Sequence, residues 1–316
     1  MRHNVLHQLP LILDFGRSNP APLRQGNAFA GLAGFLCGLC RVLITTILLI
    51  SLFGRAFAVE LPVPEKLERQ YGVHRQTIEV VEPHASTPER PTQVRYVALP
   101  LDSLLNRWFG ERWKAPEAEI VFLARDGYQS VIASSRLINY RAYLAFWLDD
   151  GTAFVIDNLQ QNEKNIPLGP YYLIWDNRNA PDLLRLGSYG WPYQVTRIEL
   201  HSASDDRQLL PPNPDPGIVK GFEAAKAYCL TCHRIRGVGG EKYPEDLVHA
   251  SCRWNEIDLK TWIDDPGRLR PGTAMPPLNR LLPTEARRGV IEQIARYLSA
   301  LKTDDPVACA SGAAKP

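Results

Sequence analysis

Between residues 59 and 204, short apolar runs alternate with polar turn signals. The runs are rich in Val, Ile, Tyr, Phe and Trp, which is typical of β-strands, and Asp-Gly turns at residues 125–127 and 149–151 separate several of them. One amphipathic helix is predicted over residues 101–109. Strands are predicted over residues 78–81, 94–99, 119–124, 143–148, 153–156, 171–175 and 193–200. This segment is therefore expected to form a mostly-β (α+β) domain built from hairpins.

The apolar pattern changes to helical spacing in the last third of the chain. Residues 221–228 are alanine-rich, and residues 256–264 follow Asn255, which is a good helix-capping residue. The last helix is predicted from Thr284, as its N-cap, to about Lys302. Its apolar positions at helical spacing are Val290, Ile291, Ile294, Tyr297, Leu298 and Leu301. Three helices and long loops predict a small all-α domain.

A proline-rich stretch separates these two patterns. Residues 205–216 hold four prolines and several acids, which predicts a semi-rigid linker. The chain is therefore expected to be multidomain. The predicted parts are a leader and signal peptide over 1–58, a mostly-β domain over 59–204, the linker over 205–216, an all-α domain over 217–303 and a tail over 304–316.

The N-terminal segment has the pattern of an export signal. Arg41 precedes an apolar run over residues 42–53, and a small-x-small triplet ends at Ala58. We expect cleavage after Ala58 and a mature chain in the periplasm. Counted from further upstream, the apolar stretch is long enough to span a bilayer, so a retained membrane anchor is the alternative. Arg41 interrupts that longer stretch.

The composition of the chain excludes few classes of binding partner. Lys and Arg number 36 against 34 Asp and Glu, so the net charge of +2 gives no case for nucleic acid. Hydrophobic residues make up 45% and charged residues 22%, as in ordinary folded proteins. No Ser-His-Asp arrangement, P-loop or dinucleotide fingerprint is recognisable in the sequence.

The strongest chemical signal is the segment Cys229-Leu-Thr-Cys232-His233. Cys-x-x-Cys-His is the haem c attachment motif, in which two thiols add to the vinyl groups of one porphyrin edge and the histidine ligates iron. A zinc site would need further ligand pairs, and only His249 and Cys252 lie nearby. A redox thiol pair would need a βαβ setting, which the pattern lacks. The sequence therefore predicts one covalent haem c, held by Cys229 and Cys232 and ligated by His233.

One methionine also attracts attention. The chain has two methionines, and the internal one, Met275, lies in the loop Pro-Gly-Thr-Ala-Met-Pro-Pro-Leu, 42 residues after His233. A loop is a poor place to use methionine as a packing residue, whereas its thioether is a soft metal ligand. His249 is the alternative second ligand.

Residues 217–302 resemble a class I c-type cytochrome. In that family the sixth iron ligand is a methionine in a proline-rich loop before the last helix, which implies this role for Met275. The family's aromatic residue four positions before the first thiol is replaced here by Ala225. A loop resembling residues 244–247 normally fixes the free N–H of the proximal histidine, but here it holds one extra residue, so the partner of His233 is left open.

The remaining cysteines leave two alternatives. Cys37 and Cys40 lie in the predicted leader. Cys252 and Cys309 could form a disulfide in an oxidising compartment and tie back the tail. The Ala/Gly/Ser/Pro-rich surroundings of Cys309 favour a mobile tail and two separate thiols.

The front domain resembles, over about 110 residues, the molybdopterin-binding domain of the sulfite oxidase family. The resemblance depends on the segments ALPLDSLL, EIVFLARDGYQSVI, YLAFWLDDG, GPYYLIWDN and YQVTRIEL. That family binds molybdenum through a cysteine, and residues 59–228 contain none, so the resemblance implies the fold and argues against molybdenum chemistry.

Other candidate residues of the front domain have simpler interpretations. His74, His84 and His201 are predicted to be solvated, and Asp126, Asp149 and Asp150 to form turns. The tryptophans are predicted to pack in the core or at an interface: Trp108, Trp113, Trp147, Trp175 and Trp191.

Together these features predict an exported electron-transfer protein with a His/Met-ligated haem c. The front domain would dock a partner, such as a periplasmic redox protein or dehydrogenase subunit. The alternative is a periplasmic oxidoreductase whose front domain oxidises a small substrate and passes electrons to the haem; the missing cysteine argues against it. A membrane contact is expected only if the leader is retained.

Overall fold

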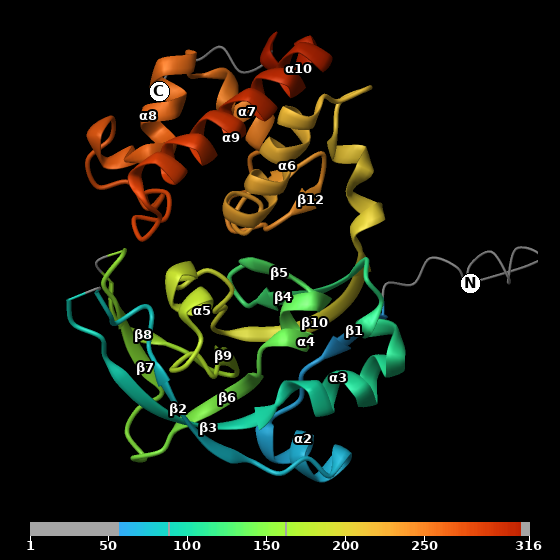
Figure 1. The fold of residues 1–316 in the computed structure, drawn as a ribbon, viewed down its shortest axis with the longest axis vertical. Coiled ribbons are helices and arrows are strands. Elements are labelled where there is room, and N and C mark those ends of the chain that lie inside the picture. Colours follow the sequence, from blue (N-terminus) through green and yellow to red (C-terminus); the bar gives the residue numbers. More distant parts are fainter. Residues whose placement is uncertain (1–56, 88, 162, 311–316) are drawn as a thin grey trace, which may run out of the picture. The chain divides into compact units, whose positions relative to one another are not determined.

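The computed structural model describes residues 57–87, 89–161 and 163–310 (Figure 1). Most of the predicted leader lies outside the described residues. The architecture is α+β, with several antiparallel sheets, including a half-barrel, followed by C-terminal helices that pack together. This confirms the predicted order of a strand-rich segment before a helical one. None of the helices in the described ranges is long and apolar enough to cross a membrane.

The first sheet has four antiparallel strands in the order β1-β10-β4-β5. They are β1 (Phe57–Glu60), β10 (Val195–Ser202), β4 (Ala118–Ala124) and β5 (Gln129–Ala133). The predicted cleavage site after Ala58 falls inside β1, whose Val59 and Glu60 pair with Ile198 and Arg197 of β10. Strand β5 is an edge strand, so one row of its backbone groups is free to pair outside the sheet.

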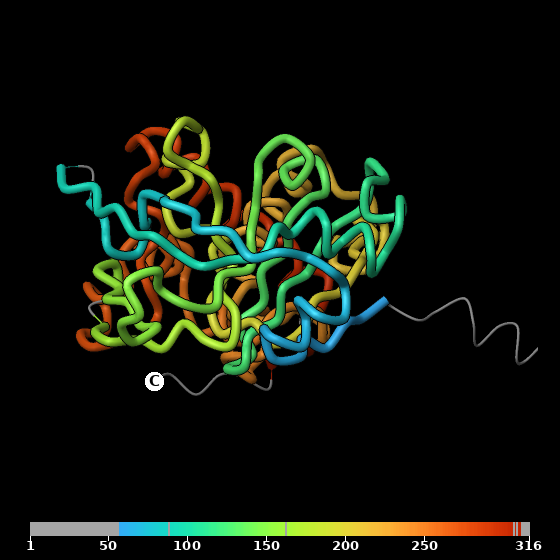
Figure 2. The backbone as a smooth tube through the Cα atoms, turned by 90° about the horizontal axis from the view of Figure 1, so that it is seen from below, coloured from blue at the N-terminus to red at the C-terminus, as the bar shows by residue number. Residues whose placement is uncertain are grey.

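The second sheet has the order β2-β3-β6-β9 and is also antiparallel. Figure 2 shows β2 and β3 (blue to cyan) running side by side in opposite directions. The strands are β2 (Gln76–Val81), β3 (Gln93–Pro100), β6 (Ala142–Leu148) and β9 (Tyr172–Trp175). A separate hairpin joins β7 (Val155–Asn158) and β8 (Glu163–Pro167).

Short helices accompany these sheets. They are α2 (Pro64–Tyr71), α3 (Leu101–Phe109), the 3-10 helix η1 (Gly110–Lys114), α4 (Ser134–Asn139) and α5 (Pro181–Leu186). Helix α3 has the predicted bounds because its apolar residues Leu101, Leu104, Leu105 and Phe109 recur at helical spacing and are all buried. Trp113, Trp175 and Trp191 are buried in the core of this part, as predicted, whereas Trp147 is 43% exposed.

The C-terminal part begins with the 3-10 helix η2 (Ala203–Leu209). It continues with α6 (Pro216–Tyr228), the short strands β11 (Arg234–Ile235) and β12 (Val238–Gly239), α7 (Leu247–Cys252), α8 (Glu256–Asp264), the 3-10 helix η3 (Pro266–Arg268), α9 (Thr284–Asp304) and α10 (Pro306–Ala310). The structure thus adds α7 and α10 to the three predicted helices.

Two predicted helix caps have different outcomes. Asn255 caps α8, because its Oδ1 accepts a hydrogen bond from the backbone N–H of Asp258 at 2.9 Å. The prediction for Thr284 is wrong, because Pro283 takes the N-cap position of α9 and Thr284 is the first helical residue. Proline fits there in an extended conformation, since the N–H that it lacks is not needed for the helix.

Helices α6 and α9 cross closely at a glycine. A Cβ atom on Gly221 would lie 2.1 Å from the backbone oxygen of Gln293, so only glycine allows this approach. Next to it, the rings of Phe222 and Tyr297 lie 5.7 Å apart. The Tyr297 hydroxyl donates to the backbone oxygen of Leu209 at 2.7 Å. Leu209 is buried, so the start of the predicted linker packs onto the helices.

The crossing predicts opposite effects for two glycine substitutions. Gly221→Ala should lower the free energy of unfolding by about 1–3 kcal/mol, because the added methyl group overlaps the backbone of α9. Gly289→Ala is the matched control, since it lies inside α9 with no atom within 4 Å of the added Cβ. It should raise stability by up to about 1 kcal/mol through helix propensity alone. Urea unfolding of both variants measures this, and equal effects would contradict the close crossing.

Candidate functional site

The predicted haem-binding residues form one tight turn at the end of α6, called here the haem-attachment turn (residues 229–233). Cys229 is the C-cap of α6 and donates its backbone N–H to the oxygen of Ala225 at 2.7 Å. The backbone N–H groups of Cys232 and His233 both donate to the oxygen of Cys229, at 3.1 and 2.9 Å. The structure therefore brings Cys229, Cys232 and His233 together on a single turn of backbone.

A glycine-containing loop closes over the backbone of this turn. Gly240 donates to the oxygen of Leu230 at 2.8 Å, and Tyr243 donates to the oxygen of Cys232 at 3.1 Å. A Cβ atom on Gly240 would lie 2.2 Å from the oxygen of Thr231. The loop therefore approaches the backbone of the haem-attachment turn so closely that only glycine fits at position 240.

The two thiols of the turn form no disulfide, and their surroundings disfavour the thiolate form. Cys229 and Cys232 are free cysteines in the structure. Burial, and secondarily the neighbouring Cys232, raises the pKa of the Cys229 thiol to about 12, and burial also raises the pKa of Cys232. Redox-active Cys-x-x-Cys pairs have the opposite property, a lowered thiol pKa. The electrostatics of this pair therefore differ from those of a disulfide-exchange site.

The surroundings of His233 favour the neutral form of its imidazole. Burial lowers its pKa, and the ring of Tyr243 stacks on it with centroids 5.2 Å apart. Its Nδ1 is buried without a hydrogen-bond partner among the described residues. The loop over residues 244–247 does not supply one, because Asp246 instead accepts from the backbone of Arg236 and Val248 at 2.6 and 2.9 Å. Neutral imidazole is the form that ligates metals.

These residues fit a covalently attached haem. Two thiols with raised pKa values stand three positions apart, and an imidazole with a lowered pKa follows directly. The buried Nδ1 of that imidazole has no partner among the described residues, so the hydrogen bond that usually orients a metal-ligating histidine is missing here. In the described part of the chain, no three His, Cys, Asp or Glu side chains are grouped so that they could hold a metal ion.

Met275 lies in the segment between η3 and α9, called here the methionine loop (residues 269–283). It is half-buried, and its backbone N–H donates to Thr273 Oγ1 at 3.3 Å. The loop is attached to α8 by the hydrogen bond from Leu278 N to the oxygen of Ile263 at 3.1 Å. Ligation of iron by Met275 stays a prediction. The alternative ligand, His249, is an exposed residue of α7.

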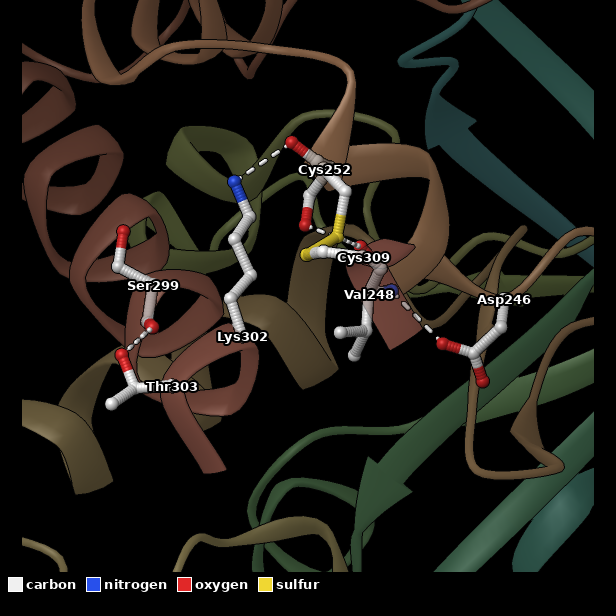
Figure 3. The surroundings of a disulfide bond; sticks show 8 residues. Asp246, Val248, Cys252, Ser299, Lys302, Thr303 and Cys309 are labelled. Atoms are coloured by element: carbon white, nitrogen blue, oxygen red, sulfur yellow. Dashed lines mark hydrogen bonds between the residues drawn. A yellow bond between two sulfur atoms is a disulfide. The ribbon is translucent and has the colours of Figure 1, made fainter. Parts of the chain in front are cut away.

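A disulfide joins Cys252 of α7 to Cys309 of α10, with Cα atoms 5.3 Å apart (Figure 3). This resolves the alternative left open by the sequence, which missed the bridge because the composition around Cys309 suggested a free tail. Nearby, the Lys302 ammonium donates to the oxygen of Ser251 at 2.7 Å. The bridge spans 57 residues, for which chain entropy predicts a stabilisation of about 4 kcal/mol.

The front domain contains a buried polar cluster that the sequence did not reveal. Glu82 is fully buried, and its carboxylate accepts from the hydroxyls of Tyr96 and Tyr172 at 2.7 and 2.9 Å. The backbone N–H of His84 donates to the same carboxylate at 3.0 Å, and the Nδ1 of its ring lies 3.0 Å from it. The prediction that His84 is solvated is therefore wrong. A buried carboxylate is retained only with such donors around it.

The other histidines and acids of the front domain behave mostly as predicted. His74 is exposed, and His201 is partly exposed but bonds Glu199 at 2.7 Å, which raises the pKa of His201. Asp126 and Asp150 are turn residues, since each carboxylate accepts a backbone N–H two residues further on, at 3.0 Å. None of these side chains lies on the haem-attachment turn.

Removal of the charge of Glu82 should destabilise the front domain. Glu82→Gln places an amide N–H₂ against groups that are themselves donors, so we expect a loss of about 2–4 kcal/mol in the free energy of unfolding. Glu79→Gln, on strand β2 just before Glu82, is the control, because its surface pair with Arg178 contributes less than about 1 kcal/mol. Equal losses in urea unfolding would refute a structural role for the cluster.

Comparison with known proteins adds no identification. No protein-family model matches the chain, and no curated protein matches its sequence. The segments that resemble the molybdopterin-binding fold lie on β3 and α3, on β4 and β5 with the turn between them, on β6, on β9 and on β10. Both resemblances, to this fold and to class I cytochromes, therefore stay predictions.

Proposed function

We propose that this protein is an exported monohaem c-type cytochrome of class I type that transfers single electrons. The observation that carries the proposal is the haem-attachment turn, which presents two thiols and an imidazole within five residues, with the thiol pKa values raised and the imidazole pKa lowered by burial. Protonated thiols with no other partner suit addition to vinyl groups. The disulfide between Cys252 and Cys309 supports the exported location, since such bonds form in oxidising compartments.

The residues of this chain would act by attachment and ligation rather than by proton transfer. Cys229 and Cys232 would hold the haem through thioether bonds, and His233 would ligate its iron from one side. Met275 would complete the axial pair. The haem itself supplies the Fe(II)/Fe(III) couple. A thioether opposite an imidazole raises the reduction potential, because the soft sulfur favours Fe(II). Ligation of the iron by both His233 and Met275 would support electron transfer.

The front domain would bind a redox partner, such as a periplasmic dehydrogenase subunit, and so dock the cytochrome to it. An active molybdenum centre in this domain would need a cysteine ligand, which residues 59–228 lack. Metal analysis of the purified protein separates the two possibilities. Molybdenum in stoichiometric amount, together with reduction of the haem by a small substrate, would overturn the proposal that the protein is only an electron carrier. It would show instead that the protein is an oxidoreductase.

Covalent haem attachment should depend on the first pair of cysteines and not on the second. After expression with haem c maturation factors, the chain should retain haem on a denaturing gel. The Cys229→Ala/Cys232→Ala variant should lose it completely, because both thioether bonds are removed. The matched control Cys252→Ser/Cys309→Ser removes the disulfide and should retain the haem. Haem staining of the wild-type chain at background level would contradict the proposed function.

The second iron ligand can be assigned by a pair of substitutions. Met275→Ala should abolish the weak methionine-to-ferric-iron absorption near the red end of the spectrum and lower the reduction potential, since the soft ligand is lost. His249→Ala should leave both unchanged, because that side chain is exposed on α7. The opposite pattern would assign the ligand to His249.

A further inference from the structure

The front domain contacts the haem-attachment turn through the edge of its first sheet. The backbone N–H of Gln129, at the start of edge strand β5, donates to the oxygen of Thr231 at 2.8 Å. In the opposite direction, the N–H of Glu241 donates to the oxygen of Gly127 at 2.8 Å. Thr231 lies between the two predicted haem-attaching cysteines. The front domain therefore provides a backbone hydrogen bond to the middle of the motif.

This contact leaves no room for a side chain. Gly127 has φ of 85°, and a Cβ atom placed on it would lie 2.8 Å from the backbone carbon of Glu241. Beside it, the ammonium of Lys242 lies 2.8 Å from the carboxylate of Asp126. Glycine at position 127 thus serves both the turn between β4 and β5 and the close approach to residues 241 and 242.

The last turn of α6 is attached to the same domain by side chains. The ammonium of Lys226, three residues before Cys229, lies 2.5 Å from the carboxylate of Glu119 on β4. Both side chains are largely buried, at 16% and 14% exposure, which weakens screening by solvent. The ring of Tyr228 meets that of Tyr189 edge-to-face, with centroids 4.6 Å apart.

A second contact holds the methionine loop. Asn279, four residues after Met275, is buried, and its Nδ2 donates to the oxygen of Leu186 at the end of α5 at 3.5 Å. The following Gly187 has φ of 60°, and a Cβ atom on it would lie 2.6 Å from Cδ1 of Leu281. The same front domain thus contacts both segments that carry predicted iron ligands.

We infer that the front domain positions both axial-ligand segments, with Gly127 and Gln129 holding the haem-attachment turn and Leu186 and Gly187 holding the methionine loop. The inference rests on the proposed function. Movement of the Asn279 end of the methionine loop away from the haem-attachment turn would break one of these two contacts. The front domain therefore stabilises methionine ligation against competing ligands, in addition to any role in docking.

Three glycine variants test this inference with imidazole as the competing ligand. Gly127→Ala and Gly187→Ala each place a methyl group in one contact. Gly151→Ala is the matched control, because Gly151 also has a positive φ of 73° but no atom within 4 Å of an added Cβ. We expect imidazole to displace methionine with about tenfold higher affinity in Gly127→Ala, whose methyl group meets the backbone of Glu241. The increase should be smaller in Gly187→Ala, whose methyl group meets only the end of the Leu281 side chain, and the control should keep wild-type affinity. The methionine absorption band follows the titration.

Amide hydrogen exchange gives a readout that does not depend on haem. The N–H groups of Gln129 and Glu241 should exchange at least about tenfold faster in Gly127→Ala than in Gly151→Ala, because their hydrogen bonds cross the contact. If Gly127→Ala does not fold, Lys242→Gln weakens the same contact more gently, and the same direction of change is expected.

The outcomes separate the two proposals. A wild-type chain without covalent haem would overturn the proposed function, and the inference with it. A normal haem with equal imidazole affinities in all three glycine variants would overturn the inference alone, and so would unchanged exchange at Gln129 in Gly127→Ala.

Discussion

Five consecutive residues, 229–233, hold two thiols and an imidazole, and their backbone depends on the surrounding chain for most of its hydrogen bonds. Among the backbone oxygens of residues 229–232, only that of Cys229 accepts a hydrogen bond from another residue of the turn. The oxygens of Leu230 and Cys232 accept from Gly240 and Tyr243, and that of Thr231 accepts from Gln129 of the front domain. Each such oxygen, buried and unpaired, would cost about 1–3 kcal/mol. The glycine-containing loop and the front domain are thus both parts of the site's backbone support.

The two cysteine pairs of the described residues differ, because one forms a disulfide and the other does not. Cys252 and Cys309 are 57 residues apart in sequence and form a disulfide, a bond that is typical of proteins in oxidising compartments. Cys229 and Cys232 are three residues apart and form no disulfide in the structure. Under the proposed function, both thiols would be used in thioether bonds to haem.

Sequence reasoning succeeded where elements are long and their pattern is periodic. Helices α3 and α8 have their predicted bounds, and six of the seven predicted strands closely match β2, β3, β4, β6, β9 and β10. It missed β1, β5, β8, α2, α4 and α5, which are short and owe their conformation to neighbours in space. Glu82 and His84 could not be predicted as buried, because their partners Tyr96 and Tyr172 are 14 and 90 residues away from Glu82 in sequence. The attachment motif was recognisable because its chemistry is local, whereas the front-domain contact at Thr231 is not.

The methionine loop is attached to the rest of the chain mainly at two residues, Leu278 and Asn279. It covers the 15 residues from Leu269 to Pro283, and loops of this length without secondary structure are uncommon unless they are functional. Its second half is held at Leu278, whose N–H bonds Ile263 and whose oxygen accepts from Arg287 at 3.1 Å, and at Asn279. Near Met275 the bond to Thr273 is only local. The contacts from α8, α9 and the front domain thus converge within four residues after Met275, so they restrict where its thioether can reach without fixing the side chain itself.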